Sequence, residues 1–156
     1  MRKALATLFA VAALAFLGFG SANKYGFYAG YGYDGMFGGQ FYLSDDMRAS
    51  IGVTPFIGIA VGGSLDFLLG RVDLSEDTEQ QLQAYYGFGF GGGFLTVLGA
   101  GAFYLHGHGL GGIEFDLPDT DLAVFGELGL GPMMIFAGGS GAFTFGYDLK
   151  MGLLFK

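Results

Sequence analysis

Large apolar side chains alternate with small or polar ones along most of this chain, and the pattern is strictest in residues 141–156. One face of this segment carries Phe143, Phe145, Tyr147, Leu149, Met151, Leu153 and Phe155, and the other carries Thr144, Gly146, Asp148, Lys150 and Gly152. Successive side chains of a β-strand point to opposite faces, so strict alternation predicts a strand with one apolar face.

The same alternation predicts about eight antiparallel strands. We expect them near residues 24–33, 37–43, 47–54, 59–72, 82–90, 102–117, 121–131 and 141–156. Asp34 and Gly35 predict a two-residue hairpin, because both tolerate positive φ angles, and polar turns are expected at 44–46 and 118–120. Residues 91–101 are apolar and glycine-rich, and residues 132–140 contain the apolar run Met133 to Phe136; we expect long connections in both places. Each could also hold a further strand, which leaves the strand count between eight and ten.

Composition decides what the apolar faces contact. The 156 residues are 52% hydrophobic and only 13% charged, and 32 of them are glycine. A soluble domain with so few charges would tend to associate in water. Beyond the N-terminus, no run approaches the ~20 apolar residues that a membrane helix needs. A hydrophobic chain without such a helix favours a closed β-barrel, because a closed sheet leaves no unpaired backbone groups in lipid.

The N-terminal residues fit export from the cytoplasm. Arg2 and Lys3 precede an apolar segment over 4–20, and Ser21 and Ala22 are small residues of the kind found at a cleavage site. We expect a cleaved signal peptide over 1–22 and a single barrel domain over 23–156. Removing the two basic residues changes the formal net charge from −7 to −9, which disfavours nucleic acid as a partner. The absence of cysteine excludes disulfides and thiolate metal sites.

With the signal peptide, the alternation over 24–156 and the closing aromatic strand, the chain resembles the small outer-membrane barrels of the OmpA and OmpX type. The resemblance implies an all-β fold, a closed antiparallel transmembrane β-barrel in the outer membrane of a diderm bacterium. It also implies outer-membrane lipid and the barrel-assembly machinery as partners. Phe155 resembles the C-terminal assembly signal of that family, although here Lys156 follows it.

Aromatic side chains on the outward face are expected to form lipid-facing surface and the girdles at both membrane interfaces, where tyrosine places its ring in the bilayer and its hydroxyl at the headgroups. The expected set is Tyr25, Phe27, Tyr31, Tyr33, Tyr86, Phe143 and Tyr147.

The inward face carries glycine and a few charged side chains. These are Arg48, Asp66, Glu114, Glu127, Asp148 and Lys150. An eight-stranded barrel has room inside for side chains and no wide channel, so the charges must pair or stay hydrated. We expect a polar network that fills the interior; the alternative is a gated narrow pore lined by the same residues.

Two histidines share the inward face of one expected strand. His106 and His108 stand two residues apart, and Glu114 follows on the same face. Such a group could share a metal or perform acid–base chemistry. No serine adjoins the histidines and no Asp-x-His pair is present. We therefore expect no catalytic residues, no cofactor and no metal, with the histidines paired in the interior or at its rim.

The expected function is a non-enzymatic outer-membrane barrel with a structural or surface-interaction role. Residues 91–101 and 132–140 would be its larger external segments. The first alternative is a narrow pore or transporter for ions or small apolar molecules. The second is a soluble secreted barrel that binds a ligand inside. The sequence identifies no protein partner.

Overall fold

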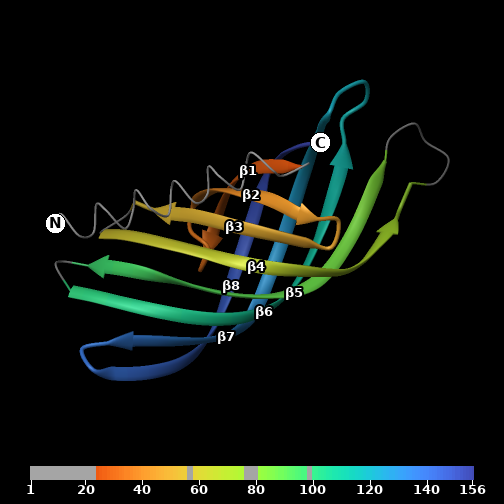
Figure 1. Ribbon diagram of the computed structural model, residues 1–156. Helices are drawn as coiled ribbons and strands as arrows, with labels where there is room; N and C mark the ends of the chain where they lie inside the picture. Colours follow the sequence, from red (N-terminus) through yellow and green to blue (C-terminus); the bar gives the residue numbers. More distant parts are fainter. Residues whose placement is uncertain (1–23, 56–57, 76–80, 98–99) are drawn as a thin grey trace.

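A computed structural model describes residues 24–55, 58–75, 81–97 and 100–156 of the chain (Figure 1). The expected signal peptide over 1–22 lies outside these residues. The described residues form eight antiparallel strands. Their bounds are β1 Tyr25–Gly32, β2 Phe37–Ser44, β3 Met47–Thr54, β4 Gly58–Asp73, β5 Leu82–Val97, β6 Ala100–Asp116, β7 Leu122–Ala137 and β8 Ser140–Phe155. The prediction of an all-β fold with about eight strands is confirmed.

The strands form a ring, in which each strand pairs with its neighbours in the sequence and β1 also pairs with β8. Both ends of the described chain and the β2–β3, β4–β5 and β6–β7 connections lie at one end of the ring, which we call the terminal end. β1, β3, β5 and β7 end, and β2, β4, β6 and β8 begin, at the other, the distal end (Figure 1). No helix occurs in the described ranges, and so they contain none long and apolar enough to cross a membrane.

The ring is taller on one side than on the other. β1, β2 and β3 have 8 residues each, whereas β4 to β8 have 16 or 17. β1 pairs with β8 only from Gly32↔Asp148 to Tyr25↔Phe155. Within the described ranges, residues 140–147 of β8 therefore pair with β7 but with no strand on the β1 side. The β5–β6 and β7–β8 hairpins extend past β1 at the distal end (Figure 1).

The two expected long connections are instead strand. β5 continues to Val97 and β6 begins at Ala100; β7 continues to Ala137 and β8 begins at Ser140. The prediction of loops over 91–101 and 132–140 was therefore wrong, and the described strands number eight without an extra one. Pro132 lies inside β7, where the β6–β7 ladder has no pair while the β7–β8 ladder continues through Pro132↔Phe145. A proline is tolerated at such a gap because it has no N–H to donate.

The β1–β2 connection differs from the expected two-residue hairpin. β1 ends at Gly32 and β2 begins at Phe37, so four residues connect them. Gly35 has a φ of 104°, which only glycine adopts readily. Tyr33 and Asp34 turn into the ring and are buried. The placement of Tyr33 in an outward girdle was therefore wrong, while the other six expected aromatics are exposed.

Glycines on the inward face make room for large interior side chains. A Cβ atom on Gly112 would overlap the ring of Tyr85 and lie 2.8 Å from the carbonyl oxygen of Gly126. At outward-facing Gly109, by contrast, a Cβ would have nothing within 4 Å. The same relation holds for Gly38 and Gly52 against Tyr28 and for Gly62 and Gly93 against Tyr104. Much of the glycine content therefore serves to fit bulky polar residues inside a narrow ring.

Candidate functional site

All six charged residues expected inside are buried within the ring. Arg48, Asp66, Glu114, Glu127, Asp148 and Lys150 are each at most 5% exposed. Five of them form one network, and Glu114 belongs to a second cluster at the terminal end. The five come from β3, β4, β7 and β8, so the network exists only once these strands are assembled.

Arg48 is the first cation of the network. Its Nε donates a hydrogen bond to Asp66 Oδ2 at 3.0 Å, and its Nη2 donates to Glu127. Tyr85 also donates from its hydroxyl to Glu127 at 3.0 Å, and its ring centroid lies 5.6 Å from the guanidinium carbon. Arg48 itself is fully buried. A charge removed from water in this way is tolerated only because two carboxylates compensate it.

Lys150 is the second cation, and it connects three carboxylates. Its Nζ lies 2.5 Å from Asp34 Oδ2, 3.0 Å from Asp148 Oδ2 and 3.8 Å from Glu127 Oε1. Lys150 Nζ also lies over the ring of Tyr28, 5.3 Å from the ring centroid. Since Glu127 also binds Arg48, the two cations belong to one continuous network.

Asp34 completes this network, and the sequence reasoning assigned it to a turn. Ser64 donates to its Oδ2 at 2.6 Å, in addition to the Lys150 contact. Burial raises the pKa of Asp34, but the Lys150 charge and hydrogen bonds from His106, Lys150 and Ser64 outweigh it and hold the pKa well below its usual range. Counting in steps of two along the chain places Asp34 on the same face as inward Tyr28, and this alternation was the signal that could have identified Asp34 as an interior residue.

The two histidines join the carboxylates from the distal side. His108 Nε2 lies 3.0 Å from Asp66 Oδ1, and His106 Nε2 lies 3.5 Å from Asp34 Oδ1. Their Nδ1 atoms face each other at 3.2 Å. The histidine pair therefore connects Asp34 to Asp66.

The network has the residue types of an acid–base or metal site. Ser64 donates to Asp34, and no histidine contact to its hydroxyl is found in the described chain. The described residues also contain no cluster of three or more histidine and carboxylate side chains that could hold a metal. Chemically, the arrangement holds charges of both signs in fixed positions inside the ring.

Glu114 lies in a separate cluster at the terminal end. Its carboxylate oxygens lie 2.7 Å from Lys24 Nζ, 3.4 Å from Arg71 Nη1 and 3.1 Å from Lys156 Nζ. Burial lowers the pKa of Lys24 and outweighs its contact with Glu114. The cluster brings the first and last described residues together and so completes the ring at this end. Phe155, the expected assembly signal, adds a stacked contact with Tyr25 at 5.0 Å.

An apolar pocket of about 410 Å³ opens at the distal end, on the other side of the network. Its floor is formed by Tyr33, whose ring centroid lies 3.9 Å from that of His106, and by Tyr104, which donates to the Tyr33 carbonyl. Inward side chains that line it include Leu95, Ala102, Met133 and Ile135. Tyr31, Phe145 and Tyr147, from outward positions of β1 and β8, also line it.

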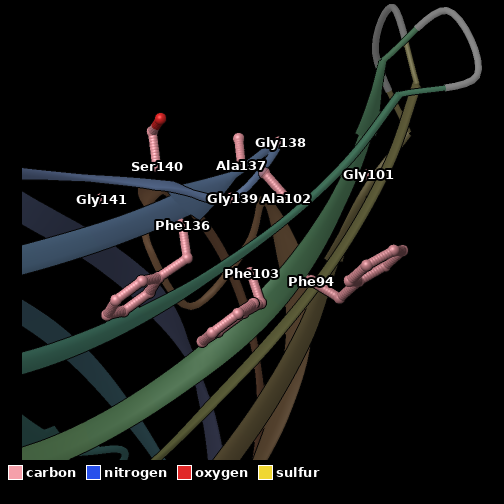
Figure 2. Close-up of a pocket in the computed structure, with 10 residues that line it drawn as sticks. All are labelled: Phe94, Gly101, Ala102, Phe103, Phe136, Ala137, Gly138, Gly139, Ser140 and Gly141. Atoms are coloured by element: carbon pink, nitrogen blue, oxygen red, sulfur yellow. The ribbon is translucent and has the colours of Figure 1, made fainter.

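A second pocket, of about 530 Å³, lies at the tips of the long hairpins. Figure 2 shows the rings of Phe94, Phe103 and Phe136 on one face of the sheet and Ser140 on the opposite face. Phe103 and Phe136 stack with their centroids 4.6 Å apart. These three rings occupy outward positions, so this pocket is part of the outer surface.

Comparison of the chain with protein-family models, curated proteins and solved structures gave no match in any of the three. The assignment of a function therefore rests on the geometry described above.

Proposed function

We propose that this protein is an outer-membrane β-barrel with a structural, non-catalytic role. The observation that carries the proposal is the distribution of charge over the two faces. None of the outward positions of the eight strands carries Asp, Glu, Lys or Arg. The charged residues of the strands occupy inward positions instead: Arg48, Asp66, Arg71, Asp73, Glu114, Asp116, Glu127, Asp148 and Lys150.

The outward face is also apolar in a continuous way. On β8, Phe143, Phe145, Tyr147, Leu149 and Met151 are between 49% and 73% exposed. A water-exposed surface of this kind would be an aggregation site, because soluble monomers rarely expose apolar patches beyond a few hundred Å². In a bilayer the same surface is favourable, and a Lys or Arg at its midplane would cost about 2–4 kcal/mol.

The filled interior favours an anchoring role over conduction. Arg48, Lys150 and their carboxylates are buried side by side across the ring, and Tyr33 and Tyr104 cover them on the distal side. We therefore expect no ion conductance through the wild-type protein in planar bilayers. Steady channel currents that disappear in Glu127→Gln would support the pore alternative.

A role as an adhesin with long external loops has little support. The β7–β8 hairpin has only Gly138 and Gly139 between its strands, and four residues connect β1 to β2. These two connections therefore offer a partner little surface. Membrane lipid is the partner that fits the apolar outer face.

The test is the gel mobility of the protein from the membrane fraction, with and without boiling. We expect detergent alone to release it and the unboiled band to migrate differently from the boiled one. Recovery in the soluble fraction with no mobility difference would overturn the proposal and favour the soluble ligand-binding alternative.

A further inference from the structure

The distal pocket has the size and lining of a site for an apolar ligand. Its volume of about 410 Å³ lies within the ~300–1,000 Å³ typical of ligand pockets. Of the described residues between the strands at this end, 33–36, 55 and 138–139, only Asp34 is charged. Because Asp34 is buried below the floor, none of the side chains lining the pocket is charged.

The pocket also opens sideways through the wall of the ring. Pairing between β1 and β8 stops at Gly32↔Asp148, and the pocket lining includes Tyr31 on one side of the gap and Phe145 and Tyr147 on the other. These three side chains occupy outward positions, whereas Met133 and Ile135 line the same pocket from inward positions. The pocket therefore runs from the interior to the outer face.

The height of the wall places this opening at the level of hydrocarbon. Eight residues of β1 span about 26 Å at ~3.3 Å per residue, or about 20 Å of height when tilted by ~40°. The apolar band of an outer-membrane barrel is ~25 Å tall. Outward aromatics continue past the end of β1, with Phe143 68% exposed and Phe145 73% exposed. The edge of β8 that has no partner on the β1 side therefore lies at membrane depth, where such backbone is tolerated only if it is buried in protein or lines a water-filled cavity; here residues 145–147 line the distal pocket.

We propose that this pocket binds the alkyl chain of a single-chain amphiphile of the fatty-acid type, which enters from the bilayer between β1 and β8. The inference rests on the proposed membrane location. The apolar lining accepts the chain, and the rings of Tyr31 and Tyr147, with centroids 5.9 Å apart, lie at the gap through which it enters. The floor of Tyr33 and Tyr104 stops the chain from reaching the ionic network.

The test uses the full chain in phosphatidylcholine vesicles and hexadecanoic acid with a photoreactive diazirine at its terminal carbon. Mass spectrometry would compare labelling of Met133, which lines the pocket, with that of Met134, which is outward and 45% exposed. We expect unlabelled hexadecanoic acid to abolish the label on Met133. The label on Met134 should not saturate, because it reports bulk lipid contact.

A pocket-filling variant and a matched control complete the experiment. Ala102→Phe places a ring in the pocket, and Ala84→Phe makes the same change at an outward position near the terminal end. We expect Ala102→Phe to lower Met133 labelling at least about tenfold, which corresponds to about 1.4 kcal/mol of binding free energy. Ala84→Phe should leave the labelling unchanged.

The gel-mobility assay on the same samples separates the two proposals. A wild-type protein that shows the mobility difference but no saturable Met133 label would overturn the ligand site and leave the membrane barrel intact. Absence of the mobility difference would overturn the membrane barrel itself.

Discussion

Replacement of Arg48 by methionine tests whether the buried network contributes to stability through paired charges. Arg48 is fully buried and donates to Asp66 and Glu127, so Arg48→Met leaves two carboxylates inside the ring without their main cation. Breaking a buried ion pair from one side costs about 3–5 kcal/mol. His108 still contacts Asp66 at 3.0 Å and Tyr85 still donates to Glu127 at 3.0 Å. The expected loss is therefore near the lower limit, about 3 kcal/mol.

The assay is urea unfolding of the protein in lipid vesicles, followed by the loss of the fast-migrating folded band. The matched control is Leu128→Met, which introduces the same residue beside Glu127 at an outward position. We expect that control to change the free energy of unfolding by no more than about 0.5 kcal/mol.

A compensated variant separates charge from packing. Arg48→Met combined with Asp66→Asn and Glu127→Gln removes the cation together with both uncompensated charges. Replacing a whole buried ionic group by neutral side chains is often close to neutral in stability. We therefore expect this triple variant to regain about 2 kcal/mol over the single variant. The reasoning is refuted if Arg48→Met costs less than about 1 kcal/mol, or if the triple variant is as unstable as the single one.

Three further predictions follow from other parts of the ring. Gly112→Ala should lower the free energy of unfolding in urea by about 1–3 kcal/mol, because the new methyl group overlaps the ring of Tyr85. Gly109→Ala has open space around it and should be neutral or slightly stabilising. Equal effects of the two substitutions would contradict the packing argument. Phe155→Ala should slow the appearance of the folded, heat-modifiable band in pulse-chase assembly, and an unchanged rate would remove Phe155 as the assembly signal. The pKa of Asp34 is lowered in the folded protein, so its ionised carboxylate stabilises the fold at any pH well above 3.8, the pKa of the unfolded chain. This stabilisation is lost as the pH falls below 3.8. The urea midpoint should therefore drop between neutral pH and about pH 3, and it should drop less in Asp34→Asn.

The period-two pattern predicted the faces of the strands well because it depends only on backbone geometry. On β6, the expected inward set of Tyr104, His106, His108 and Glu114 faces the interior, and Phe103 is exposed outside. The pattern needs no knowledge of neighbouring strands, since successive side chains alternate whatever the partner strand is.

The strand ends at the distal side could not be predicted in the same way. Residues 91–101 are rich in glycine, and residues 132–140 begin with Pro132 and contain Gly138 and Gly139, which are features of a connection. In the ring, Gly93 is needed because Tyr104 occupies the space of a side chain, and Pro132 falls where the β6 ladder is interrupted. Both reasons are contacts with another strand, and so local sequence contains no trace of them. Asp34 was missed for a related reason, because its role depends on Lys150, which is 116 residues away.

The charged interior also explains how such a repetitive chain can select one register. A shift of β8 by one residue against β7 would move Asp148 and Lys150 to the outward face and would place Leu149 and Met151 inside. A lysine at the lipid midplane costs about 2–4 kcal/mol, and the carboxylates left inside would lose their cation. Glycine-rich strands without charges would lack this penalty, because most of their small side chains fit either face. The network can therefore specify the register even where its net contribution to stability is small. The triple variant of Arg48, Asp66 and Glu127 removes the corresponding inward charges of β3, β4 and β7. Although close to the wild type in stability, it should therefore assemble with a larger misfolded fraction, measured as protein that never acquires the heat-modifiable band.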